Sequence, residues 1–209
     1  MTATGRWRLR LAVLLVGLVV VACGGDSEPQ QKTLLPKKIQ PQAKVLPGEA
    51  KPYIVVRKDD NSFPGRKRVI FTISSSADSI QARSGTVVKA ALDLQKTTSA
   101  DLVEVCLYPS EKLAAIGDSF VAKALFAPDG GGASGNQGWR WDVCVSSEPY
   151  TKQDIEIEES WLGNKDRFRM PNGGVDEQKL KKFLSKKLGL PVGEIVLPFL
   201  SCDTTVNVN

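Results

Sequence analysis

The stretch 69–108 constrains the fold of this chain more than any other part of the sequence. Residues 69–73 are rich in β-branched side chains, which predicts a strand. Residues 78–97 repeat apolar side chains about every 3.6 positions, which predicts a helix. Residues 101–108 alternate like a second strand, which Pro109 ends. A strand, a helix and a strand in this order imply a parallel pair with a right-handed crossover, so that the helix covers one face of the sheet.

The remaining elements add further strands and a second helix. The predicted strands are residues 53–57, 120–126, 139–145, 154–158 at a sheet edge and 195–199 near the end; residues 110–118 form a short connection, 172–174 a turn, and 176–188 a helix. We therefore expect an α+β fold. Its sheet is mixed and largely antiparallel, with about four to six strands, one helix packed on a face and a further C-terminal amphipathic helix.

The predicted C-terminal helix has two very different faces. Its apolar stripe consists of Leu180, Phe183, Leu184 and Leu188, and its polar face carries Lys179, Lys181, Lys182, Lys186 and Lys187. A solvated helix face has this pattern. A surface that is attracted to anionic lipid has it as well, so both alternatives stay open.

The first 22 residues have the organisation of a secretory signal peptide. Arginines at positions 6, 8 and 10 precede the apolar run 11–22, and Ala22 places a small residue before Cys23. The apolar run is shorter than the roughly 20 residues that cross a bilayer. An ordinary signal peptide with a cysteine near its end is the alternative reading.

The tetrapeptide Val20-Val21-Ala22-Cys23 resembles the lipobox of bacterial lipoproteins. The resemblance implies that Cys23 becomes the first residue after cleavage. It also implies that Cys23 carries a diacylglyceryl thioether, often with an additional N-acyl chain such as palmitate. We expect this lipid to hold the protein on the extracytoplasmic side of the cell membrane or the outer membrane. Gly24, in place of aspartate, favours the outer membrane where the organism has one.

The sequence predicts three consecutive parts. Residues 1–22 are the signal peptide, and residues 23–52 are the lipidated cysteine with a disordered tether rich in Pro, Lys and Gln. Residues 53–209 form a single globular domain. The tether is a plain spacer or, alternatively, a segment that binds the cell wall or a partner.

Charge and histidine content exclude several functions. The formal charge of +5 comes from 28 basic and 23 acidic residues, and removing three signal-peptide arginines leaves 25 against 23. We therefore expect no nucleic-acid partner. No histidine occurs in the chain, which excludes Ser-His-Asp and Cys-His catalysis and His-ligated zinc. We assign no catalytic, cofactor-binding or metal-binding residue and expect no cofactor.

Three cysteines follow Cys23, and export places them where disulfides form. Cys106, Cys144 and Cys202 allow three pairings, with one thiol left over. We favour a Cys106–Cys144 disulfide, because both side chains are predicted to lie on the sheet face away from the helix.

A glycine-rich loop, residues 130–138, precedes Trp139 and Trp141. The loop lacks the Lys-Ser/Thr of a phosphate-binding loop and reads as a flexible hairpin connection. Aromatic side chains at a period of two usually belong to a core, and a platform that stacks on sugar or peptidoglycan is the alternative.

Several segments together resemble the bacterial domain of unknown function 4875. They are Gly65-Arg-Lys-Arg68, Val103-Glu-Val-Cys-Leu-Tyr-Pro109, Phe120-Val-Ala-Lys-Ala-Leu-Phe-Ala-Pro-Asp-Gly130 and Gly138-Trp139. The resemblance covers roughly residues 52–142. The chain departs from it by a glycine-rich insertion before Trp139 and by some 65 further residues. The resemblance to this family implies the order of strands and helix given above. It implies no activity, cofactor or catalytic residue.

These observations favour a membrane-anchored cell-envelope lipoprotein with a non-enzymatic binding or scaffolding module. Its expected partners are the membrane, through Cys23, and a cell-envelope protein or peptidoglycan. One alternative is an enzyme that works without histidine, through groups such as Asp118, Tyr108 or Glu104. The other alternative is a structural factor in envelope assembly.

Overall fold

The computed structural model describes residues 47–117, 119–198, 200–206 and 208. Residues Ile39–Asn209 group as one compact unit, which holds all of these described residues. The signal peptide, Cys23 and most of the predicted tether lie outside the described residues.

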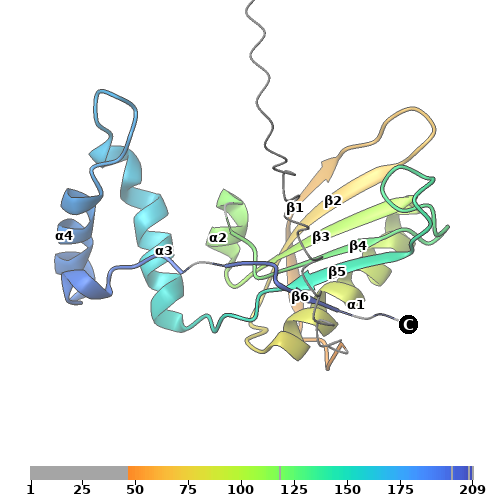
Figure 1. Cartoon of the computed structure of the whole chain (residues 1–209), viewed down its shortest axis with the longest axis horizontal. Helices are drawn as coiled ribbons and strands as arrows, with labels where there is room; N and C mark the ends of the chain where they lie inside the picture. Colours follow the sequence, from red (N-terminus) through yellow and green to blue (C-terminus); the bar gives the residue numbers. More distant parts are fainter. Residues whose placement is uncertain (1–46, 118, 199, 207, 209) are drawn as a thin grey trace, which may run out of the picture. The chain divides into compact units, whose positions relative to one another are not determined.

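A six-stranded sheet forms the centre of this unit (Figure 1). Its strands follow one another in sequence order, and they are β1 (Tyr53–Asp60), β2 (Arg68–Ser75), β3 (Leu102–Tyr108), β4 (Ala122–Phe126), β5 (Trp141–Val145) and β6 (Thr204–Thr205). Strands β2 and β3 are parallel, and every other pair is antiparallel. The predicted α+β class with a mixed, mostly antiparallel sheet is therefore confirmed.

Helix α1 (Ile80–Thr98) makes the crossover between the parallel strands, as the sequence predicts. One face of β2 and β3 pairs Val69 with Val103, Phe71 with Val105 and Ile73 with Leu107. The same layer continues through Ala122 and Ala124 of β4 to Val145 and Val143 of β5. All of these side chains are buried. The small alanines leave room for α1, which packs across β3, β4 and β5.

Helix α2 (Glu111–Ile116) lies within residues 110–118, which the sequence predicts to be a short connection. The Ser110 side chain caps its first turn by accepting from the Leu113 amide, and Gly117 ends it in the left-handed conformation. Leu113 and Ala114 are buried. The six residues are too few to show a helical period in sequence, so only the two caps signal this helix.

Residues 154–158 are not an edge strand, because they lie within helix α3 (Lys152–Asn164). Thr151 and Asp154 form a capping box at the start of the helix. Ile157 and Trp161, four residues apart, are both buried on one side. The alternation over five residues is therefore a short segment of a helical pattern that extends beyond it.

The predicted C-terminal helix is confirmed as α4 (Glu177–Leu188), with Asp176 as its N-cap and Gly189 as its C-cap. It pairs with α3 around a second, smaller core. The single-turn helices η1 (Lys165–Phe168) and η2 (Val192–Glu194) join this pair. Together, α3, η1, α4 and η2 form what we call the helical hairpin.

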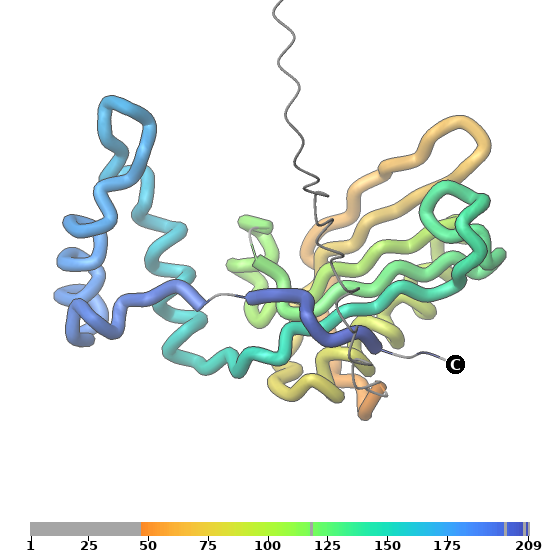
Figure 2. The backbone as a smooth tube through the Cα atoms, viewed as in Figure 1, coloured from red at the N-terminus to blue at the C-terminus, as the bar shows by residue number. Residues whose placement is uncertain are grey.

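The final strand is not where the sequence predicts it. Ile195 is fully buried in the core of the helical hairpin, and no strand is assigned over the described residues 195–198. The last strand is instead β6, which pairs with β5. Figure 2 shows the end of the chain returning alongside β5, where the amide of Val206 also donates to the carbonyl of Val143. An apolar run beside a helix core cannot be distinguished from a strand by composition.

The predicted Cys106–Cys144 disulfide is wrong, because Cys144 bonds to Cys202 with Cα atoms 5.3 Å apart. Cys106 is a free thiol. Cys106 and Cys144 do share a sheet face, but Lys123 of β4 is the register partner of both. Their Cα atoms are therefore two strand spacings of about 4.8 Å apart. This distance exceeds the limit of roughly 7 Å between the Cα atoms of a disulfide.

Residues 48–52, assigned to the tether from sequence, pack along the first half of α1. The Gly48 amide donates to the Gln81 carbonyl, and the Lys51 amide donates to the Thr86 hydroxyl at 2.9 Å. Gly85 permits this approach, because a Cβ atom there would collide with the Gly48 carbonyl oxygen. These residues therefore belong with the domain.

Substitution of Gly85 by alanine tests this packing. Alanine favours a helix by about 1 kcal/mol, but the collision with Gly48 costs about 1–3 kcal/mol. We expect Gly85→Ala to bring no gain and to lower the free energy of unfolding by up to about 2 kcal/mol in urea titrations. Gly163→Ala in α3 is the matched control, since a Cβ atom there has nothing within 4 Å. It should stabilise the protein by about 0.5–1 kcal/mol. Equal gains in both variants would contradict the account.

Candidate anion-binding pocket

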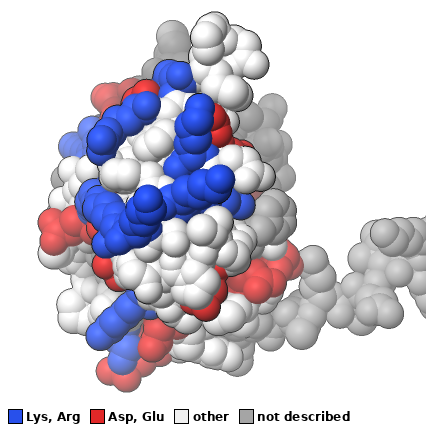
Figure 3. Space-filling model, turned by 90° about the vertical axis from the view of Figure 1, so that its left-hand side faces the viewer, with Lys and Arg blue, Asp and Glu red and all other residues white. Residues whose placement is uncertain are grey.

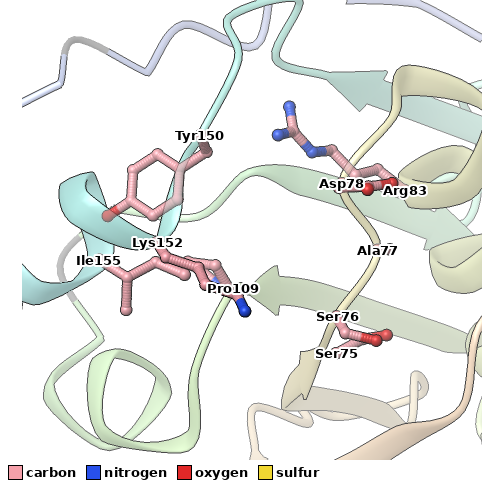
Figure 4. A pocket seen from close by; sticks show the side chains of 9 residues that line it. All are labelled: Ser75, Ser76, Ala77, Asp78, Arg83, Pro109, Tyr150, Lys152 and Ile155. Atoms are coloured by element: carbon pink, nitrogen blue, oxygen red, sulfur yellow. The ribbon is translucent and has the colours of Figure 1, made fainter.

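A pocket of about 460 Å³ lies beside the carboxyl ends of β2 and β3, the only parallel pair among the described strands. In open sheets with parallel strands, ligands commonly bind at such ends. The lining residues are Ser75, Ser76, Ala77, Asp78, Arg83, Pro109, Tyr150, Lys152 and Ile155. Figure 4 shows residues 75–78 and Arg83 on one side and Tyr150, Lys152 and Ile155 on the other. We call this cavity the carboxyl-end pocket.

The local sequence explains one wall of the pocket. Strand β2 ends at Ser75, and four residues later the Ser79 side chain caps α1 by accepting from the Ala82 amide at 3.1 Å. The first turn of α1 contains no acidic residue. The amide dipoles of a 19-residue helix therefore present their positive end near this wall.

Arg83 is the unusual residue of the pocket, because it is charged and only 1% exposed. Its Nη1 donates to the carbonyls of Ser146 at 3.0 Å and Glu148 at 2.9 Å. Its buried Nε has no hydrogen-bond partner within the described residues. The ion pairs found in that part of the chain include none with Arg83.

The burial of Arg83 affects its pKa and the energetic cost of its charge. Desolvation lowers the pKa of the Arg83 guanidinium, and the nearby Asp78 carboxylate offsets this only in part. Arginine nevertheless stays charged at neutral pH. A buried charge without an ionic partner is costly, and buried charges are normally paired. An anion that entered the carboxyl-end pocket would therefore be stabilised by the charge of Arg83.

The opposite wall holds a second buried polar pair. The Tyr150 hydroxyl donates to the Glu158 carboxylate, and both residues are buried. Burial and Glu158 raise the pKa of Tyr150, so the phenol stays protonated at all ordinary pH values. Lys152, at the rim, is exposed to solvent and adds a second positive charge. Asp78 is also exposed and is the one acidic lining residue.

The loop that holds Arg83 is fixed by the C-terminal segment. The Ser147 amide and hydroxyl donate to the two carboxylate oxygens of Asp203 at 3.0 and 2.8 Å. These bonds lower the pKa of Asp203 to about 2. The Cys144–Cys202 disulfide lies directly beside them in sequence. Disulfide and carboxylate together therefore position the two carbonyls that Arg83 contacts.

The residues considered for histidine-free catalysis do not gather in this pocket. Glu104 lies on β3 and pairs with Lys123 at 2.7 Å. Tyr108 is buried at the end of the same strand, four residues further on, about 13 Å away along an extended chain. Asp118 lies outside the described residues. Within the described part of the chain, no group of three potential metal ligands occurs.

The tryptophans and the glycine-rich loop are used in packing. Trp141 stacks on Phe126 with ring centroids 4.2 Å apart, and the Trp139 ring lies against Gly132. The loop is held by Arg66, which is 7% exposed and contacts Asp129 at 2.8 Å and the Gly132 carbonyl. Trp141 therefore packs against the main core, as the core interpretation predicts, whereas Trp139 packs against the glycine-rich loop. Arg66 fixes this loop, which the sequence predicts to be flexible.

Sequence reasoning missed Arg83, since one arginine in an amphipathic helix usually points to solvent. The available signal was its place in the first turns of α1, directly after the serine-rich run from Ser74 to Ser79. Only the fold shows that this turn faces the sheet end and the loop after β5.

The architecture defines an α+β domain with one parallel strand pair and a pocket at its carboxyl ends. The chain belongs to the family of domain of unknown function DUF4875, whose model matches residues 48–200. The match confirms the family resemblance and extends it beyond residues 52–142 on both sides. It takes in residues 48–52 and the helical hairpin.

A solved structure shares this fold. The crystal structure of a DUF487 family protein from Desulfovibrio piger is 26% identical, with a TM-score of 0.64. The similarity covers 74% of this chain and 94% of that chain. No curated protein matches the sequence. None of the described helices is long and apolar enough to cross a membrane.

The cysteine assignment predicts a specific thiol chemistry in the unit 39–209. Burial and the Glu104 charge raise the pKa of Cys106 to about 11. The thiolate is the reactive form, so alkylation by iodoacetamide at pH 8 should be roughly a hundredfold slower than after denaturation. The rate should rise as the pH approaches 11. Intact mass without reductant should show one alkylated thiol after denaturation. Labelling of Cys202 under these conditions would refute the pairing.

Proposed function

We propose that this protein is a lipoprotein of the cell envelope, anchored through Cys23, whose domain is a non-enzymatic binding module. The ligand presents an anionic group, carboxylate or phosphate, to Arg83 in the carboxyl-end pocket. This proposal assigns the protein to the extracytoplasmic side of the cell membrane or the outer membrane.

The buried, unpaired charge of Arg83 is the observation that carries the binding proposal. A buried ion that fulfilled only a structural role would be expected to face a carboxylate. Arg83 faces two carbonyls and a pocket instead. An anion entering the pocket supplies the missing partner and accepts charge-assisted hydrogen bonds. The dipole of α1 favours the same sign of ligand.

The rest of the lining indicates what accompanies the anionic group. Ala77, Pro109, Ile155 and the ring of Tyr150 are apolar surfaces. A pocket of about 460 Å³ has the size of small-ligand sites. A small molecule or chain end with one anionic and one apolar part fits this combination.

Anchoring through Cys23 rests on the sequence features of the first 23 residues. Each buried CH₂ adds roughly 0.8 kcal/mol, and stable membrane attachment needs more than one chain. A diacylglyceryl group meets this requirement. The anchor keeps the binding module at the membrane surface rather than in bulk solution.

Thermal unfolding with inorganic phosphate tests the binding proposal on the unit 39–209. At constant ionic strength, with a dissociation constant near 1 mM, 20 mM phosphate stabilises by about 1.8 kcal/mol. The unfolding temperature should then rise by about 4–6 °C. Acetate serves as the carboxylate probe in the same assay. No stabilisation by either anion would contradict the proposal.

Variants of the lining separate this pocket from general anion effects. Arg83→Met should remove the phosphate-dependent shift, and Lys152→Glu should reduce it without affecting the fold, since Lys152 is exposed. Asp78→Asn should enlarge the shift, because it removes a like charge. Lys96→Glu, an exposed change at the far end of α1, is the control. A shift that Lys152→Glu and Lys96→Glu alter equally would argue against the pocket.

Replacement of Cys23 tests the anchor. Cys23→Ala should abolish incorporation of labelled palmitate and move the protein from the membrane fraction to the aqueous fraction. Cys106→Ala is the matched control and should leave both unchanged. Retention of Cys23→Ala in the membrane fraction would exclude lipid anchoring at this residue.

A further inference from the structure

The charge of the domain is unevenly distributed. Residues 47–209 contain 21 basic and 21 acidic side chains, so that their formal charges cancel. Residues 165–197 alone contain eight basic and four acidic side chains, whereas the remainder contains 13 basic and 17 acidic ones. The net charge is therefore +4 in this segment and −4 in the rest of the domain. We call residues 165–197 the basic segment.

The basic segment comprises η1, α4 and η2 of the helical hairpin. Leu180 and Leu184 are fully buried against α3, which directs the lysines of α4 outward. Figure 3 shows Lys and Arg side chains gathered over the face that the helical hairpin presents. Lys182, Lys186 and Lys187 are exposed and form none of the ion pairs found among the described residues.

Exposed apolar side chains occur in the same segment. They are Met170, Val192, Val196 and Leu197, each between 38% and 55% exposed. Surfaces that bind lipid headgroups commonly combine basic residues with exposed apolar ones. Lysines, as compact point charges, suit a diffuse array of anionic headgroups better than a single bidentate ligand.

The length of chain before the domain limits where this surface can act. The 24 residues from Cys23 to residue 46 span at most about 85 Å when fully extended. A lipid at Cys23 would thus hold the basic segment close to the bilayer at high effective concentration. Weak electrostatic attraction is sufficient for contact under such conditions.

We infer that the basic segment docks on anionic phospholipid headgroups of the leaflet that carries the Cys23 lipid. This inference rests on the proposed lipid anchor. Each basic residue near an anionic leaflet strengthens the association about fivefold. The −4 charge of the remaining domain is repelled by the same leaflet. Docking therefore selects one orientation, with the helical hairpin toward the lipid.

Vesicle cosedimentation of the unlipidated unit 39–209 tests docking independently of the anchor. This unit contains both hydrophobic cores and all described elements, so it is expected to fold by itself. Vesicles with 30% phosphatidylglycerol should bind it at least tenfold better than pure phosphatidylcholine vesicles. Raising NaCl to 0.5 M should remove most of the binding, because salt screens exposed charges.

A pair of charge-matched triple variants locates the interaction. Lys182→Glu/Lys186→Glu/Lys187→Glu should weaken binding to the anionic vesicles tenfold or more. Lys58→Glu/Lys96→Glu/Arg140→Glu changes the total charge equally at exposed positions elsewhere, and it should have less than a threefold effect. Circular dichroism melting should show both variants folded.

Two outcomes would overturn the inference. One is binding that does not distinguish anionic from neutral vesicles, including no binding to either. The other is equal loss in both triple variants, which would show an effect of net charge alone. Labelling of Cys23 with palmitate in either case would leave the anchor proposal intact while the docking inference fails.

Discussion

A single buried guanidinium joins the start of α1 to the chain that leaves β5. Arg83 donates to the carbonyls of Ser146 and Glu148, so the crossover helix and the loop toward the helical hairpin are fixed to each other. The loop is held from its other side by Asp203. The two walls of the carboxyl-end pocket therefore depend on one charged side chain. That side chain keeps part of its hydrogen-bonding capacity unused.

The centre of the sheet is predictable from sequence because its side chains obey one period. Val103, Val105 and Leu107 alternate with Glu104 and Cys106, while β2 is apolar at Val69, Ile70, Phe71 and Ile73. The register in the structure joins Val69, Phe71 and Ile73 with the set on β3 into one buried layer. The apolar spacing of α1 and α4 is equally regular. In these elements, local periodicity and tertiary packing favour the same secondary structure.

Other features depend on contacts that periodicity does not contain. Whether residues 154–158 form a strand or a helix is decided by Trp161 and Thr151, which lie outside the alternating five residues and extend the buried face and the capping box of α3. The disulfide depends on strand order, since one intervening strand places Cys106 out of reach of Cys144. Arg83 becomes a site residue only when the loop after β5 covers it. The disulfide and the role of Arg83 are long-range consequences of topology, and no local pattern encodes them.

The proposed anion site and the proposed lipid-docking surface belong to different elements of the domain. The first uses a desolvated charge in a cavity, and the second uses solvated lysines on a helix face. Because Arg83 is desolvated, it favours an anion that fits into the cavity. The exposed lysines of α4 instead favour a surface with a high density of negative charge. A binding module that is oriented by its lysines would hold its pocket in a fixed relation to the membrane.

Binding of an anion beside Arg83 is tested most directly by a nuclear magnetic resonance titration of the ¹⁵N-labelled unit 39–209 with inorganic phosphate. If an anion binds beside Arg83, saturable shifts are expected at the backbone amides of residues 77–84, 146–148 and 150, together with the side-chain Nε–H of Arg83. Small, non-saturating changes are expected at the lysines of α4. Saturable shifts confined to residues 179–187, with none around Arg83, would contradict binding in the carboxyl-end pocket.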